Sequence, residues 1–277
     1  MAAQTPYTGR ELSKIALQVA TEASRLILGG FRQRQTVSIK ADQSPVTEFD
    51  LQSEQLIRER LAELTPDIIV VGEEQGGQAA GEFTWYCDPI DGTINFMRGH
   101  PFFAVSLGVA RHGEPFAGAV VAPALRLWWR GSRDDRAYRC EAPCEVSTTD
   151  DLGHAVLTSG LPVRGRAVAE SGLDVVLRLS PFVRDLRRCG SAAIELCMVA
   201  DGSYDAYVTR ALSPWDTCAG AAILLAAGGR WQAWSEGERH YEFGCNAGIH
   251  AAVLERLGPP SSVPGASSGG HPTQVPG

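Results

Sequence analysis

The segment from Phe83 to Thr93 constrains the fold and the chemistry of this chain more than any other. Phe83 to Cys87 have the composition of a short buried strand, and Asp88-Pro89-Ile90-Asp91-Gly92-Thr93 follow it directly. Aspartates crowded at a strand end repel each other unless a cation lies among them. With no histidine or cysteine beside them, such oxygen ligands suit Mg²⁺ better than Zn²⁺. The Gly-Thr pair offers backbone N–H groups and a hydroxyl at which a phosphate could rest.

Composition excludes several other classes of function. The net charge of −7 over 277 residues argues against a nucleic-acid polymer as partner. The N-terminus lacks the pattern of a secretory signal, and no apolar run approaches the ~20 residues that span a bilayer. The seven cysteines are odd in number and form no CxxC pair, so we expect reduced thiols in a cytoplasmic protein.

The first half predicts two helices followed by a sheet. Thr8 and Glu11 have the spacing of a capping box, and apolar residues then recur at helical spacing from Leu12 to Leu28. A hairpin-like region around 40–47 precedes a second helix over 50–64. Strands are expected over 68–71, 83–87, 103–110, 117–122 and 126–130, and a short helix over 94–98.

The second half alternates strands and helices, which favours an α/β layer. We expect strands over 155–159, 185–188, 204–208 and 230–233, and helices over 173–179, 191–200, 216–227 and 247–257. The change of pattern predicts an N-terminal α+β subdomain over 1–148 and a C-terminal α/β subdomain over 149–257. Residues 258–277 are Pro-, Gly- and Ser-rich without periodicity, which predicts a disordered tail.

Five carboxylates lie at or just beyond the ends of predicted elements, and each alone has an ordinary explanation. Asp216 could be only a helix cap, and Asp91 with Gly92 could be only a turn. A turn, however, does not need a second aspartate that a proline fixes at the end of a buried strand. The set consists of Glu73, Glu74, Asp88, Asp91 and Asp216.

Taken together, the motifs resemble the signatures of the inositol monophosphatase family, whose members are magnesium-dependent, lithium-sensitive phosphatases. The resemblance extends from about Leu12 to Leu257. It implies an αβαβα sandwich with the site between the two halves, and a homodimer as the assembly. The matching stretches are 44–50, 72–74, 88–96, 188–193 and 215–220.

The resemblance implies two to three Mg²⁺ ions per site. Glu73, Asp88 and the Ile90 carbonyl would hold the first. Asp88, Asp91 and Asp216 would hold the second, and a third would contact Glu73 and waters. Such ions would turn an acidic pocket attractive to a dianionic phosphate and would acidify the attacking water.

The resemblance also implies the remaining roles at the site. Thr93, backed by Asp50, would help Glu73 orient a metal-bound water, and the N–H groups of Gly92 and Thr93 would bind the phosphate. Lys40 and Glu74 match positions near the metals. Further substrate contacts are expected at Gly190, Ser191, Ala192, Thr209 and Arg210.

The alcohol that is released is less well defined. Family members that prefer inositol phosphate carry a glutamate seven residues before the Trp-Asp aspartate, where this chain has Thr209. Arg210 beside it could meet a second phosphate or a carboxylate, or could be a solvated loop charge. We favour inositol 1-phosphate or a related polyol or sugar phosphate, with relaxed specificity. The alternatives are a 3′(2′),5′-bisphosphate nucleotidase, a histidinol-phosphatase, and a non-catalytic relative that binds metal or phosphate.

Overall fold

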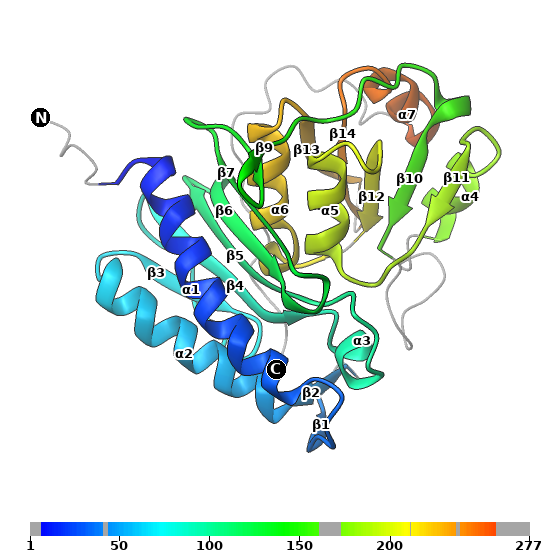
Figure 1. Ribbon diagram of the computed structural model, residues 1–277. Helices are drawn as coiled ribbons and strands as arrows, with labels where there is room; N and C mark the ends of the chain where they lie inside the picture. The colour runs from blue at the N-terminus through cyan, green and yellow to red at the C-terminus, as the bar shows by residue number, and fades with distance from the viewer. Residues whose placement is uncertain (1–6, 41–43, 161–172, 211, 237–238, 259–277) are drawn as a thin grey trace, which may run out of the picture.

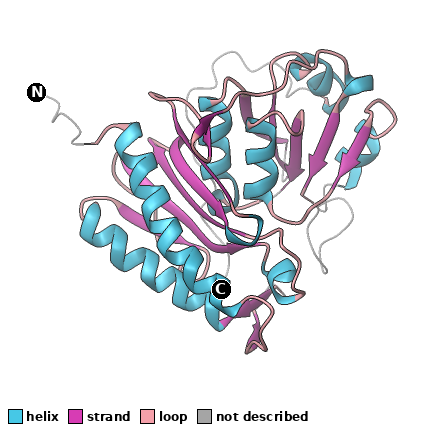
Figure 2. Cartoon of the chain, viewed as in Figure 1, coloured by secondary structure: helices cyan, strands magenta, loops and turns pink. Residues whose placement is uncertain are grey.

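The computed structural model describes residues 7–40, 44–160, 173–210, 212–236 and 239–258, and these residues form alternating layers of helix and sheet (Figures 1 and 2). A pair of helices covers one face of a seven-stranded sheet, and a second pair lies between that sheet and a five-stranded one. Two short helices cover the far face of the smaller sheet. This is the αβαβα sandwich expected from the sequence. The predicted tail lies outside the described residues except for Gly258.

The seven-stranded sheet has its strands in chain order, with β3 parallel to β4 and every later pair antiparallel. The long helices α1 (Gly9–Gly30) and α2 (Glu48–Leu64) cover its outer face. The small hairpin of β1 (Val37–Ile39) and β2 (Pro45–Thr47) lies beside them. The strands are β3 (Ile69–Gly72), β4 (Phe83–Asp91), β5 (Ala104–Arg111), β6 (Glu114–Ala122), β7 (Leu127–Ser132), β8 (Tyr138–Arg139) and β9 (Ala142–Pro143).

The five-stranded sheet has the order β11-β10-β12-β14-β13, in which the first three strands are parallel. Its strands are β10 (Val156–Ser159), β11 (Asp185–Arg187), β12 (Ala206–Arg210), β13 (Arg230–Glu236) and β14 (Arg239–Cys245). Helices α5 (Ala192–Ala200) and α6 (Pro214–Ala226) lie between the two sheets, and α4 (Leu173–Leu179) and α7 (His250–Leu257) lie on the far side (Figure 1). The remaining elements are α3 (Thr93–Met97) and the single 3₁₀ turns η1 (Pro123–Leu125) and η2 (Leu152–His154).

Local sequence chemistry determines where the first helices begin. Thr8 accepts a hydrogen bond from the Glu11 backbone N–H, and the Glu11 carboxylate accepts one from the Thr8 N–H at 2.8 Å, which is the predicted capping box. Thr47 and Asp50 repeat the arrangement at the start of α2. Because Asp50 is also a predicted site residue, the start of α2 and the site are built from the same side chain.

The contact between α6 and the larger sheet is unusually close because glycines line the strand side. A Cβ atom built at Gly108 of β5 would lie 2.5 Å from the Ala219 nitrogen of α6, and one at Gly118 of β6 would lie 2.8 Å from the Ala219 Cα. Helix α6 therefore packs backbone against backbone on β5 and β6. This contact fixes the position of the first turn of α6, which carries Asp216.

The structure corrects parts of the predicted element map. Strand β14 is absent from our sequence prediction, although it lies between β12 and β13 in the smaller sheet. Strand β12 covers Ala206–Arg210 instead of 204–208, so that Thr209 and Arg210 belong to a strand rather than to a loop. The predicted 1–148 and 149–257 boundary falls between the two sheets and stays a prediction. All seven cysteines are free thiols, and four of them are buried.

Candidate active site

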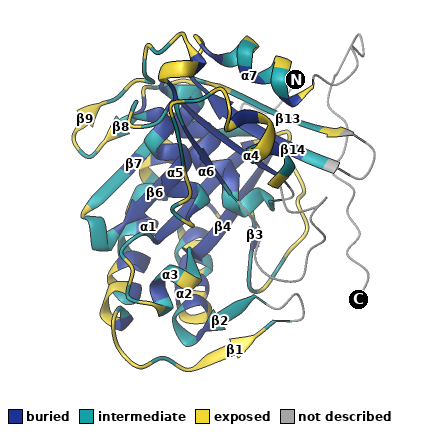
Figure 3. Cartoon of the chain, turned by 90° about the vertical axis from the view of Figure 1, so that its right-hand side faces the viewer, coloured by how far each residue is buried: buried dark blue, intermediate teal, exposed yellow. Residues whose placement is uncertain are grey.

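The two aspartates of the opening motif lie at the end of a strand that is buried along its whole length (Figure 3). In a regular strand, residues three apart point to opposite faces. Here the register between β4 and β5 shifts. Asp88 pairs with Ser106 and Asp91 pairs with Ala104, so an advance of three residues along β4 corresponds to an advance of two along β5. The irregularity brings the two carboxylates to the same side. Their exposed fractions are 2% and 7%.

Glu73 reaches the same place because β3 and β4 are parallel. Gly72 pairs with Cys87, and the Glu73 N–H donates to the Cys87 carbonyl at 3.2 Å. The residues that follow the two strands therefore share one edge of the sheet. Asp216 arrives from the other half of the chain, in the first turn of α6, where one of its carboxylate oxygens accepts the Ser213 N–H at 2.8 Å.

Electrostatics show how close these carboxylates lie. Burial, followed by the negative charges of Glu73, Asp91 and Asp216, raises the pKa of Asp88 well above its usual range. Burial and the charges of Glu73 and Asp91 raise the pKa of Asp216 in the same direction. Burial also raises the pKa of Asp91 to about 6, although hydrogen bonds from Ser191 and Ala193 oppose the rise. Carboxylates from both halves of the chain thus lie near enough to oppose one another's ionisation.

Asp91 also connects the two halves directly. Its Oδ2 atom accepts a hydrogen bond from the Ser191 hydroxyl at 2.6 Å and one from the Ala193 N–H at 2.7 Å, at the start of α5. We predicted that Ser191 contacts substrate, and that role stays a prediction. The bond from Ser191 to Asp91 was not foreseen.

The Gly92–Thr93 turn is held against the 188–191 segment. Gly92 has a φ of +96°, and a Cβ there would lie 2.9 Å from the Phe102 carbonyl and 3.1 Å from the Gly190 carbonyl, so only glycine fits. The Asn95 side-chain amide donates to the carbonyls of Phe102 and Cys189 at 2.7 and 2.8 Å. The predicted phosphate-contact residues of the first half therefore lie next to Gly190.

The predicted pairing of Thr93 with Asp50 is present. Thr93 Oγ1 lies 3.3 Å from Asp50 Oδ1 and 3.2 Å from the Ile90 carbonyl oxygen. The other Asp50 oxygen accepts the Thr47 N–H and hydroxyl, at 2.8 and 2.6 Å. Burial raises the pKa of Asp50 to about 6 against these hydrogen bonds. Since a hydroxyl has one proton and two lone pairs, Thr93 Oγ1 can still accept a hydrogen bond.

Lys40 lies at the acidic end of β3, and its predicted place near the metals stays a prediction. Its ammonium donates to Glu73 Oε1 at 2.7 Å and to Glu74 Oε1 at 2.6 Å. Burial raises the pKa of Glu74 to about 7, although the bond to Lys40 works against the rise. Lys40 thus neutralises part of the negative charge at this end of the site.

Thr209 and Arg210 point to opposite faces of β12. The Thr209 hydroxyl is buried on the inner face and donates to the Gly160 carbonyl at 3.1 Å. Arg210, 2% exposed, pairs with Asp174 at 2.8 Å, and its guanidinium lies 4.4 Å from the Tyr241 ring centre. Arg210 is therefore not a solvated loop charge, and the carboxylate that it meets belongs to the protein. A substrate contact for either residue stays a prediction.

The sequence analysis missed three further buried carboxylates near the site: Glu54, Glu242 and Glu195, the last of which accepts the Cys189 N–H at 2.7 Å. Glu54 of α2 accepts the backbone N–H groups of Glu74 and Gln75. Glu242 of β14 lies opposite Thr209 in the sheet and accepts the hydroxyl proton of Thr217 at 3.2 Å. An acidic residue at a core-facing helix position was the available signal for Glu54. Glu242 alternates with Tyr241 and Phe243, a strand pattern that we did not recognise.

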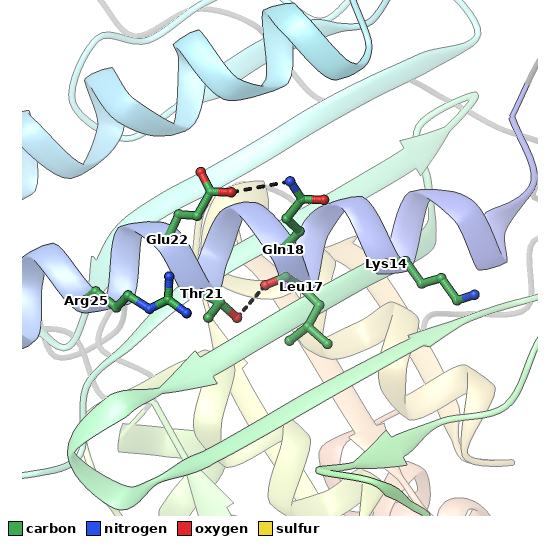
Figure 4. Close-up of a pocket in the computed structure, with 6 residues that line it drawn as sticks. All are labelled: Lys14, Leu17, Gln18, Thr21, Glu22 and Arg25. Atoms are coloured by element: carbon green, nitrogen blue, oxygen red, sulfur yellow. Dashed lines mark hydrogen bonds between the residues drawn. The ribbon is translucent and has the colours of Figure 1, made fainter.

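A shallow hollow along the solvent side of α1 lies elsewhere (Figure 4). Its six lining side chains belong to this single helix, and two hydrogen bonds among them, Gln18 to Glu22 and Thr21 to the Leu17 carbonyl, are internal to the helix. The carboxylates of the candidate site do not line it.

Comparison with known proteins agrees with this geometry. The model of the inositol monophosphatase family matches residues 9–257. The chain belongs to the inositol monophosphatase family. It is 36% identical over 221 residues to a fructose-1,6-bisphosphatase/inositol-1-monophosphatase of Aquifex aeolicus, covering 79% of this chain and 83% of that one.

Two further relatives support the family assignment. The inositol-1-monophosphatase SuhB of Mycobacterium tuberculosis is 36% identical over 240 residues, covering 79% of this chain and 82% of the relative. The solved inositol monophosphatase of Anabaena matches with a TM-score of 0.79 at 28% identity, covering 90% of this chain and 95% of that one. As a member of this family, the chain is a phosphatase that hydrolyses phosphate monoesters of small molecules.

The donor set fits the metal on which the family in general depends, Mg²⁺. Glu73, Asp88, Asp91 and Asp216 offer hard oxygen atoms, and burial together with neighbouring negative charges raises the pKa of Asp88 and of Asp216, an effect that a bound cation would offset. Among the described residues, no three potential ligands are already arranged around a common metal position. In this conformation the Lys40 ammonium holds the Glu73 carboxylate. Among the described residues no helix is long and apolar enough to cross a membrane.

Proposed function

We propose that this phosphatase hydrolyses inositol 1-phosphate or a related polyol or sugar phosphate. The observation that carries the proposal is the convergence of buried carboxylates from both halves, since burial and the charges of Glu73, Asp91 and Asp216 raise the pKa of Asp88. The names of the Aquifex and Mycobacterium relatives support substrates of this class. Asp88 and Asp91 come from β4 and Asp216 from α6, so the reacting phosphate would lie between the two sheets.

The proposed ligands are Glu73, Asp88, Asp91, Asp216 and the Ile90 carbonyl, for two to three Mg²⁺ ions. When bound, Mg²⁺ supplies positive charge for the phosphate oxygens and lowers the pKa of water. The side chains leave oxygens available for this role. Asp91 uses only Oδ2 toward Ser191 and Ala193.

The chain's own groups orient the reactants. The N–H groups of Gly92 and Thr93 donate to the phosphate oxygens, next to the fixed Gly190 carbonyl. Thr93 Oγ1 accepts a hydrogen bond from the attacking water, while its own proton is donated to Asp50 or to the Ile90 carbonyl. Glu73 accepts the proton that the water gives up as its oxygen bonds to phosphorus; the ester P–O bond breaks, and the released alkoxide takes a proton from solvent. Lys40 keeps the neighbouring Glu73 and Glu74 partly neutralised.

Phosphate release from a panel of substrates tests the proposal. The panel contains inositol 1-phosphate, fructose 1,6-bisphosphate, histidinol phosphate and adenosine 3′,5′-bisphosphate, each with and without Mg²⁺. We expect Mg²⁺-dependent release, fastest with the inositol or sugar phosphate. If phosphate is released fastest from adenosine 3′,5′-bisphosphate or from histidinol phosphate, the proposed substrate class is wrong and the enzyme is a nucleotidase or a histidinol-phosphatase. No release from any of the four compounds would favour a non-catalytic relative.

Asp91→Asn is the variant that separates catalysis from folding. The amide keeps the shape of the side chain but removes a charge from the proposed metal site, so we expect kcat/KM to fall by about 100-fold or more. Asp67→Asn is the matched control, because Asp67 is an exposed turn residue. An Asp91→Asn enzyme as active as the Asp67→Asn enzyme would contradict the assignment.

A further inference from the structure

Glu54 is a fully buried carboxylate on α2 that faces the loop after β3. Its Oε2 atom accepts the Glu74 N–H at 2.7 Å, and its Oε1 atom accepts the Gln75 N–H at 3.0 Å. Arg58, one turn further along the helix, donates its Nε–H to the same Oε1 at 2.8 Å. The carboxylate thus has three donors, and two of them are backbone groups of the loop.

Arg58 connects the same loop to the strand before it. Its guanidinium donates to the Val70 carbonyl at 3.1 Å and to the Gly76 carbonyl at 2.5 Å. Gly76 in turn accepts the Gly72 N–H at 3.0 Å, which closes the turn. Glu54 and Arg58 therefore hold the turn from both sides, one through its N–H groups and the other through its carbonyls.

The fit around Glu54 is tight. A Cβ atom built at Gly72 would lie 2.4 Å from Glu54 Oε1 and 2.7 Å from Oε2, so the strand end rests directly on the carboxylate. Glu73 lies between Gly72, which packs on the Glu54 carboxylate, and Glu74, whose N–H donates to that carboxylate. The direction in which the Glu73 side chain leaves the backbone is consequently set from α2.

An ordinary helix ion pair does not explain this arrangement. The Glu22–Arg60 pair on the same side of the molecule is also 2.8 Å long, but both of its side chains are about 30% exposed. Such pairs contribute little to stability. Glu54 is instead fully buried and accepts two of its three hydrogen bonds from the backbone beside Glu73.

We propose that Glu54 is a positioning residue, which acts through the backbone of the 73–75 turn to set Glu73 for binding of the divalent cation. The inference rests on the proposed function in one respect, namely that Glu73 is a cation ligand. Groups that hold metal ligands in place typically change metal affinity by about 10- to 100-fold when they are altered. Glu54 does so without touching the metal or the substrate.

Glu54→Gln tests the role. Glutamine has the size of glutamate, but one of its two side-chain polar groups is an NH₂ that cannot accept a hydrogen bond from the Glu74 or Gln75 N–H or from Arg58. We expect the Mg²⁺ dissociation constant, measured by calorimetry without substrate, to rise about 10-fold or more. The Mg²⁺ concentration for half-maximal activity should rise in parallel, while kcat at saturating Mg²⁺ stays within a few-fold of wild type. Glu22→Gln, which breaks the comparable exposed pair, should leave both Mg²⁺ values unchanged.

Arg58→Lys covers the case in which Glu54→Gln does not fold. Lysine keeps the charge beside Glu54 but cannot reach Val70 and Gly76 together, so Mg²⁺ binding should weaken by several-fold. Wild-type Mg²⁺ affinity in a folded Glu54→Gln protein, or in Arg58→Lys if the first does not fold, would overturn the inference. Failure of the proposed function would look different, because the wild-type protein itself would then show no Mg²⁺-dependent phosphate release.

Discussion

Glu242 of β14 is a buried carboxylate whose pKa is raised by its burial. Burial raises its pKa to about 8, and the hydrogen bond from the Thr217 hydroxyl only partly offsets this. Its other charged and titratable neighbours are His240 on its own strand at 3.9 Å, Asp216 on α6 and Tyr207 on β12. We therefore expect Glu242 to be mainly protonated at neutral pH in the folded protein.

The effect of Glu242 on stability has a definite sign. Between its ordinary pKa of 4.5 and about 8, the unfolded chain loses this proton and the folded chain keeps it. The folded state then binds more protons, so the free energy of unfolding falls as pH rises through this window. We expect Glu242→Gln, which cannot ionise, to be more stable than wild type at pH 8 by a few kcal/mol, at most about 5.

The measurement is urea unfolding of both proteins at pH 5 and pH 8 in EDTA. The gap between Glu242→Gln and wild type should widen from the lower pH to the higher. Glu255→Gln is the control, since the Glu255 side chain is 80% exposed and should show no such change. A gap that is the same at both pH values would show that Glu242 ionises normally in the folded protein.

Among the elements, the packing of α6 on β5 depends on a glycine. Gly108→Ala would place a methyl group 2.5 Å from the Ala219 nitrogen, and a backbone atom cannot move aside as a side chain can. We expect a loss of about 1–3 kcal/mol in the free energy of unfolding. Activity should also fall, because α6 carries Asp216 in its first turn.

Thermal and urea unfolding test this contact, with phosphate release as the second readout. Gly29→Ala in α1 is the matched control, because a Cβ there meets nothing within 4 Å. That substitution should stabilise the protein by at most about 1 kcal/mol, since alanine favours the helix. Equal stability of the two alanine variants would mean that α6 can move away from β5 without cost.

The helices and strands that were predicted well are those that a pattern in neighbouring residues marks. The Thr8–Glu11 capping box and the 3.6-residue spacing gave α1, and the apolar run with its acidic end gave β4. Strand β14 was missed although Tyr241, Phe243 and Cys245 alternate with Glu242 and Gly244, which is the pattern of a strand. Strand β12 was cut short because Thr209 and Arg210 are polar, yet both are buried by partners that lie far away in the sequence.

At the scale of the whole molecule, the site depends on contacts between the two halves. The residue types of the metal site were predicted from the motifs, because carboxylates at strand ends are a local feature. The bonds from Ser191 and Ala193 to Asp91 span about a hundred residues of sequence and have no local signal. The same holds for Asn95 and the Cys189 carbonyl. Sequence therefore indicated which groups react, and the fold alone shows what holds them together.

Because the proposed ligands come from both halves, Mg²⁺ should stabilise the folded protein as a whole. A cation that binds only the folded state adds about 2.7 kcal/mol at 100 times its dissociation constant, or roughly 5–10 °C in Tm for a chain of this size. Asp216→Asn should lose most of this shift, although its amide oxygen can still accept the Ser213 N–H at the start of α6. Asp67→Asn, altered at an exposed turn, should keep it. Thermal unfolding in EDTA and in Mg²⁺ measures both, and a full shift in Asp216→Asn would mean that the cation binds to the first half alone.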